Sequence, residues 1–357
     1  MNGWRWLSKA AAVAALLMPA AAQIAAQKPK PAEAATCATC HASVVNNYAH
    51  APMRHAMEPE GADPALAAHP DLRLEQGGYS YRIETKNGKS TYTVSDGKET
   101  LTLPVRWPMG MHGQTWVLEK DGKYYESMVS YFPRINGLGT TPGDNKIVPH
   151  TLTEAMGREL PLWEARECFD CHGSGVKAGE VLAPEKVKPG LECEHCHAGA
   201  EQHLADAQKG DFKSRPPSLK KLDAESLSGF CGNCHRSWDT VMRNGWHGPA
   251  FVRFQPYRLA LSRCFAGNDA RIGCLACHDP HQGVSHDPAY YDKKCLACHA
   301  DGASTASAAG VAAPKSCPVA KTNCVSCHMQ KVELPGGNAA FTDHFIRIAK
   351  PGEAYPY

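Results

Sequence analysis

Polar and apolar residues alternate along the middle of the chain, in short runs rich in β-branched and aromatic side chains. The runs are residues 79–84, 90–94, 100–105, 115–119 and 124–131, and the dipeptides between them include Asn87-Gly88, Asp96-Gly97 and Asp121-Gly122. A period of two is typical of strands, and Asn-Gly or Asp-Gly between two strands is the strongest short-range signal for a hairpin. The pattern therefore predicts an antiparallel β-hairpin insertion.

A continuous apolar run lies near the N-terminus, at residues 10–18. Arg5 and Lys9 precede it and small residues follow it through Ala22, which is typical of a cleaved secretion signal. The run is too short to span a bilayer comfortably. We expect cleavage after Ala22 and export to the periplasm or the extracellular space. A later site near Ala35 and an uncleaved anchor are the alternatives.

The motif Cys-x-x-Cys-His occurs seven times and uses fourteen of the sixteen cysteines. In c-type haem attachment the two thiols bond to the haem vinyl groups and the adjacent histidine ligates the iron. One copy alone would also fit a zinc or redox pair, but seven copies predict seven covalently bound c-type haems. The attaching cysteines are Cys37, Cys40, Cys168, Cys171, Cys193, Cys196, Cys231, Cys234, Cys274, Cys277, Cys295, Cys298, Cys324 and Cys327. The proximal iron ligands are His41, His172, His197, His235, His278, His299 and His328.

Eleven histidines lie outside the motifs, and seven haems with two axial histidines each would need seven of them. The distal candidates along the chain are His150, His203, His247, His281 and His344. For the first haem, the candidates His50, Met53 and His55 share one window. A methionine ligand would raise the potential of that haem, and we favour a histidine.

Cys264 and Cys317 belong to no motif. In an exported protein an isolated pair of cysteines predicts one disulfide, and two unpaired thiols are the alternative. In the chain-entropy account such a bond would stabilise the fold by about 4 kcal/mol.

The seven motifs and the alternating runs together predict a mainly α fold with much irregular structure, wrapped around seven haems. The antiparallel β-hairpin insertion in this fold is small. Each haem brings a large apolar surface, so we expect the cofactors to form much of the core. The expected organisation is a signal peptide at 1–22, a linker at 23–35, a first haem segment at 36–70, the insertion at 71–149 and a six-haem cytochrome region at 150–357.

Several segments resemble the multihaem c-type cytochromes related to the nitrifier tetrahaem cytochrome c and to hydroxylamine oxidoreductase, some of which are fused to tetratricopeptide repeats. The resemblance rests on the stretch from Cys37 to Met53, on 190–203, on 275–281, and on Cys327-His328-Met329 with the segment around His344. It implies a mostly α fold with stacked and perpendicular haem pairs, and it supports His203 and His344 as distal ligands. The Cys-x-x-Cys-Lys motif of pentahaem nitrite reductases does not occur.

The expected function is electron relay between redox partners through closely packed haems. Such partners would be a quinol-oxidising complex, small cytochromes or a terminal reductase. The 38 basic and 36 acidic residues form no basic tract that would bind nucleic acid. The first alternative is an oxidoreductase in which one open haem acts on small nitrogen or sulfur oxyanions, with His69, Arg106, His112 and Tyr131 as unassigned polar residues for such a pocket. The second alternative is a structural subunit of a larger assembly, and an oligomer is compatible with the sequence.

Overall fold

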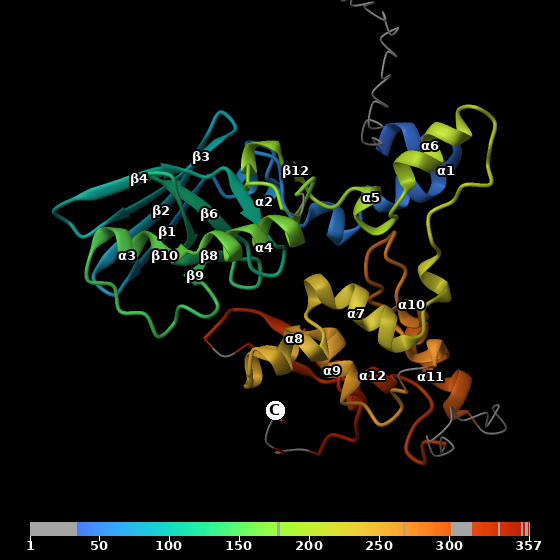
Figure 1. The fold of residues 1–357 in the computed structure, drawn as a ribbon. Helices are drawn as coiled ribbons and strands as arrows, with labels where there is room; N and C mark the ends of the chain where they lie inside the picture. The colour runs from blue at the N-terminus through green and yellow to red at the C-terminus, as the bar shows by residue number, and fades with distance from the viewer. Residues whose placement is uncertain are drawn as a thin grey trace, which may run out of the picture.

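The computed structural model describes residues 34–176, 179–266, 269–300, 316–334 and 336–350, together with Glu353 and Pro356. The predicted signal peptide and nearly all of the predicted linker lie outside these residues. Figure 1 shows a β-rich body beside a second region of short helices and long connections. No helix within the described ranges is long and apolar enough to cross a membrane.

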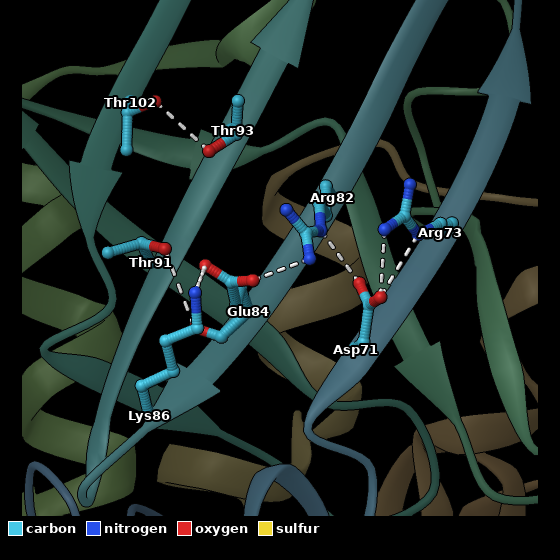
Figure 2. A network of polar contacts seen from close by, with 8 residues as sticks. All are labelled: Asp71, Arg73, Arg82, Glu84, Lys86, Thr91, Thr93 and Thr102. Atoms are coloured by element: carbon cyan, nitrogen blue, oxygen red, sulfur yellow. Dashed lines mark hydrogen bonds and ion pairs between the residues drawn. The ribbon is translucent and has the colours of Figure 1, made fainter.

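The first sheet is antiparallel, with the order β1-β2-β3-β4. Its strands are β1 (Asp71–Gln76), β2 (Tyr79–Lys86), β3 (Lys89–Ser95) and β4 (Thr100–Pro104). Burial alternates along β3, where Tyr92 and Val94 are fully buried and their neighbours are not. The outer face is polar, and Figure 2 shows Asp71 and Arg82 paired across β1 and β2 at 2.7 Å. Exposed pairs of this kind add little stability, so the sheet depends on its inner face.

The second sheet has the order β10-β7-β6-β5 and packs against the first. Its strands are β5 (Trp107–Met109), β6 (Thr115–Lys120), β7 (Lys123–Ser127) and β10 (Gly157–Leu160), and the pair β8 (Val129–Phe132) and β9 (Gly137–Thr140) adjoins it. Trp116 and Leu118 of β6 enter the core shared with the first sheet. Val117, on the opposite face, is also buried. The second sheet is therefore the middle layer of three.

Helix α4 (Leu162–His172) forms the third layer. Its Ala165 and Phe169 are fully buried against Trp107 and Val117 of the second sheet. The ring of Phe169 lies edge-on to Trp107, with ring centres 5.2 Å apart. The second Cys-x-x-Cys-His motif forms the end of α4, so packing on the sheet fixes where that motif lies.

The other helices are short and few of their side chains are buried together. They are α1 (Ala34–Tyr48), α2 (Pro64–Ala68), α3 (Leu152–Met156), α5 (Cys193–Cys196), α6 (Ala200–Ala207), α7 (Ala224–His235), α8 (Trp238–Arg243), α9 (Gln255–Ala260), α10 (Cys274–Cys277), α11 (Pro288–His299) and α12 (Cys324–His328). Within the described part of the chain, the connections include the 3-10 helices η1 (Pro52–His55), η2 (Pro184–Lys186), η3 (Leu219–Lys221), η4 (Pro249–Arg253) and η5 (Ala270–Ile272). Two small ribbons complete the fold, β11 (Gly173–Ser174) with β12 (Lys188–Pro189) and β13 (Lys331–Glu333) with β14 (Ala340–Thr342).

The prediction of a mainly α fold was wrong. The described residues are 36% helix and 22% strand, in several antiparallel sheets. The alternation pattern located the strands, but it did not show that they stack as two sheets with a helix on the outer side. Strand β10 lies past residue 149, where the insertion was predicted to end, and it still pairs with β7.

Candidate functional site

Each Cys-x-x-Cys-His motif lies in a short helix or at its end. Helices α4, α7, α11 and α12 end at motif histidines, and α5 and α10 are single turns that a motif histidine follows directly. Residues three and four positions apart lie on one face of a helix, so the two thiols and the imidazole of a motif project to the same side. The first motif lies within α1, whose backbone leaves helical geometry at His41, with φ of −117° and ψ of 36°.

All seven motif histidines line one continuous cavity of about 4680 Å³. An ordinary small-molecule pocket has about 300–1,000 Å³, so this space is several times larger than one ligand requires. Helices from the whole helical region border it, together with the loop after β5. The arrangement suits several large apolar groups side by side better than one substrate.

Three motif histidines face a second histidine across this cavity. The ring centres are 6.4 Å apart for His41 and His203, 5.9 Å for His197 and His281, and 6.1 Å for His278 and His344. A metal–imidazole bond is about 2.0 Å long, so two rings on opposite sides of one metal have centres about 6 Å apart. The three spacings fit one iron between each pair.

In each pair, Nδ1 of the second histidine lies within hydrogen-bond distance of an oxygen acceptor. Nδ1 lies 2.6 Å from the Ser214 carbonyl oxygen in His203, 3.0 Å from that of Thr342 in His344, and 3.1 Å from an Asp279 carboxylate oxygen in His281. An acceptor at Nδ1 fixes the tautomer and the ring orientation, as metal-ligating histidines usually require. Nε2 is then the nitrogen left to ligate.

Residues of α9 and the loop after it hold the segment that carries His344. Arg258 forms a two-pronged ion pair with Asp343, with both N–O distances 2.8 Å and both side chains nearly inaccessible to solvent. The Ser262 hydroxyl donates to the His344 carbonyl and accepts the Ile346 amide. Arg258 and Ser262 are four residues apart and so share a side, which binds both flanks of His344.

Burial keeps several of these imidazoles neutral. It lowers the pKa of His172, His235 and His278, and it lowers the pKa of His344 to about 4. The neutral form is the one that ligates a metal, so the buried rings are in a binding-competent state at neutral pH.

Neighbouring motifs touch through their thiols. A hydrogen bond to the Cys234 thiol, with burial, raises the pKa of Cys171, and a hydrogen bond to Cys274 does the same for Cys231. These contacts join motifs two and four and motifs four and five. Motifs six and seven are joined by the Asp292 carboxylate of α11, which accepts the Asn323 and Cys324 amides at 2.7 and 2.8 Å.

The first and third motifs are also held together. Burial, with the nearby Cys37 thiol, raises the pKa of Cys193 to about 11. Tyr48 donates to the Leu191 carbonyl at 2.9 Å. Gly190 has φ of +71°, and a Cβ there would lie 1.8 Å from the Arg54 carbonyl oxygen. Glycine is therefore required for the chain before motif three to approach the first haem segment.

The remaining predicted residues divide between the cavity wall and other parts of the structure. Both ring nitrogens of His55 lie 2.8 Å from acceptors, on Glu58 and Ala49. Met53 lines the cavity, whereas His50, His150 and His247 are not among its lining residues. Cys264 and Cys317 both line it as free thiols, with no bond between them in this structure.

Three lining histidines were outside the set of distal-ligand candidates, although His112 is among the polar residues named above for an open-haem pocket. They are His112, His195 and His286. His112 comes from the loop between β5 and β6, and its ring centre lies 5.7 Å from that of Phe341. Its position after Met111 in a turn-rich segment gave no motif spacing that would identify it.

The motif geometry and the shared cavity are those expected of a c-type cytochrome. Residues 149–198, which run from α3 through α5 and carry the second and third motifs, match the family described as cytochrome c554 and c-prime. This match supports a multihaem c-type cytochrome with covalently bound haem that acts in electron transfer. No curated protein and no solved structure matches the chain.

Proposed function

We propose that this chain is an exported heptahaem c-type cytochrome that relays electrons between redox partners. The observation that supports this most is the single cavity lined by all seven motif histidines. Each bound haem would supply a one-electron iron centre. The fourteen motif cysteines would hold the seven haems, and the motif histidines would ligate the irons from one side.

On the other side of three irons, we assign His203, His281 and His344 as ligands. Their ring spacings and their engaged Nδ1 atoms support this. Two histidine ligands leave an iron no open coordination position for a substrate. These three sites are therefore suited to electron transfer and not to substrate chemistry.

The contacts between motifs support a continuous relay. Motif one adjoins three, two adjoins four, four adjoins five, and six adjoins seven. Cys196 also lies close enough to Cys231, and Cys277 to Cys295, to raise the pKa of the second thiol in each pair. Motif three is therefore near motif four, and helices α10 and α11, which carry motifs five and six, pack together, so no motif is isolated.

The proposed location is the periplasm or the extracellular space. It rests on the apolar run at 10–18 with Arg5 and Lys9 before it. The proposed partners are a quinol-oxidising complex, small cytochromes or a terminal reductase. A partner would dock near an exposed haem edge.

A second candidate is an oxidoreductase with one open haem, and a count of histidines favours it. Among the described residues that line the cavity, six histidines lie outside the motifs, one fewer than the seven motifs. They are His112, His195, His203, His281, His286 and His344. At least one iron would then lack a second histidine from this set, and it would be ligated by methionine or remain open to a small oxyanion.

The test is to produce the full chain with a haem-attachment system and to record its intact mass and its paramagnetic resonance spectrum. The relay predicts seven attached haems, an N-terminus at Gln23 and no response to nitrite, hydroxylamine or sulfite. A high-spin signal that one of these compounds shifts would favour the oxidoreductase. Fewer than seven haems would refute the proposal.

Single substitutions test the ligands. His203→Ala, His281→Ala and His344→Ala should each convert one low-spin haem to high spin. His55→Ala is the matched control, because both of its ring nitrogens already contact other acceptors. A spectrum unchanged by the first three variants would contradict the assignment.

A further inference from the structure

Arg253, the last residue of η4, lines the cavity without a partner for its charge. Its Nε is buried and makes no hydrogen bond, and within the described residues no ion pair reaches its guanidinium. The side chain contacts the Phe254 ring, whose centre lies 5.4 Å from Cζ. Arg236, on the same wall, differs because Glu167 pairs with it at 3.0 Å.

Arg253 as a whole is partly buried, but its Nε is enclosed and has no hydrogen-bond acceptor, which favours an anionic partner. A guanidinium stays charged in proteins, so it cannot relieve desolvation by losing its proton as a lysine does. A buried donor of a charged group that is left without an acceptor costs free energy. Burial lowers the pKa of Arg253, in agreement with a desolvated and unpaired group.

The acidic residue whose charge acts on Arg253 does not supply this anion. Glu126 of β7 also lines the cavity and its charge acts favourably on Arg253. Its carboxylate, however, already accepts a hydrogen bond of 2.6 Å from Arg158 of β10. The acceptor for Arg253 must therefore come from a group that occupies the cavity.

We propose that Arg253 binds a carboxylate-type oxyanion in the cavity beside motifs two and four. Arg236, the residue after motif four, lies over the Trp246 ring, and the centre of that ring is 5.9 Å from the Phe254 ring that Arg253 contacts. Motif two adjoins this place, because Cys171 and Cys234 of motif four are hydrogen-bonded. This location makes a haem propionate from one of these two motifs the first source. A free oxyanion has the same chemistry and is the second source. The inference rests on the proposed attachment of haem at these motifs.

The test compares Arg253→Gln and Arg253→Lys in the full, haem-loaded protein by redox titration in buffer free of added oxyanions. If the partner is a propionate, Arg253→Gln should lower the midpoint potential of one haem, because the unpaired negative charge stabilises the ferric iron. Arg253→Lys keeps the charge and should keep most of the potential. Arg243→Gln is the matched control, because it removes an exposed cation from neighbouring α8.

A second arm adds nitrite or sulfite to the wild-type protein and to Arg253→Gln. If the wild-type potentials respond to either probe and the variant does not, the site binds a free oxyanion. If Arg253→Gln changes neither the potentials nor the response to either probe, the inference is overturned. A mass that shows motif two or four without haem would instead overturn the proposed function, and the propionate source with it.

Discussion

The two regions of this protein differ in what fills their interiors. The two stacked sheets and the helices α2 and α3 that pack on them, residues 64–160, are called the sandwich here. Sixteen buried side chains form its main core, among them Tyr92, Trp116 and Val129, which are fully buried. In the helical region, the core formed by Val241, Phe254 and Tyr257 is much smaller. There the interior is mostly the cavity that the motifs surround. The sandwich therefore has a side-chain core of its own, whereas the helical region leaves space that the proposed haems would fill.

The largest expected effect is that of withholding haem. In protein produced without haem attachment, residues 71–160 should keep slow amide hydrogen exchange, because their apolar core is complete. The segments from 190 to the end should exchange rapidly, since little apolar side-chain surface is buried there. Hydrogen exchange measured by mass spectrometry compares the two regions in one sample. Equal protection of both regions would show that the helical region has a sufficient core of its own.

Trp116→Ala should destabilise the sandwich and leave the proposed haem sites unchanged. This side chain is fully buried between the sheets, and its removal should lower the free energy of unfolding of the sandwich by about 3–5 kcal/mol. Trp163→Ala is the control, because that side chain on α4 is 64% exposed. Thermal unfolding followed by near-ultraviolet circular dichroism measures the loss. An equal effect of both substitutions would contradict the assigned core.

Asp343→Ala should act in the helical region and reach a haem. It removes the carboxylate that pairs with the buried Arg258, at a cost of about 3–5 kcal/mol, and it releases one flank of His344. We expect one haem to become partly high spin, as in His344→Ala. The double variant Arg258→Met/Asp343→Leu removes both charges and should recover most of the stability. If Asp343→Ala lowers stability but leaves every haem low spin, the ion pair supports the fold without positioning His344.

A smaller effect is expected from pH in the sandwich. Burial, with the charges of Glu126 and Glu164, raises the pKa of Asp144 to about 7, against the favourable charge of Arg158. The folded state therefore binds this proton more tightly than the unfolded state. The associated stability is complete below the unfolded pKa of about 4 and is lost as the pH rises through 7. Between pH 5 and 8 the sandwich should lose about 1–3 kcal/mol.

Asp144→Asn is the direct check on that dependence. The amide has no proton to lose, so thermal unfolding of the variant should depend less on pH over this range. An unchanged pH profile would assign the dependence to other groups.

The sequence predicted the strands better than their packing. The predicted runs at 79–84, 90–94 and 100–105 correspond to β2, β3 and β4, because turn residues such as Asn87 and Gly88 act locally. The burial of Val117 on the second face of β6 depends on α4, which lies some forty-five residues further along the chain. Local alternation carries no signal for such a contact. The sequence therefore predicted a small hairpin insertion where the structure has two stacked sheets.

The residues of the candidate site also fall into those that local sequence predicts and those that only the tertiary structure brings together. The attachment motifs are fixed by local spacing, so all seven could be read from the sequence. Which histidine faces which motif depends on long connections, as when His344 meets His278 across 66 positions. His112 and Arg253 come from a sandwich loop and a 3-10 helix, and only the tertiary structure brings them to the cavity wall.

The most direct test of the account is anomalous diffraction at the iron edge from crystals of the haem-loaded protein. We expect seven iron positions inside one cavity, three of them midway between the rings of His41 and His203, of His197 and His281, and of His278 and His344. Fewer than seven irons, or irons absent from these three positions, would contradict it.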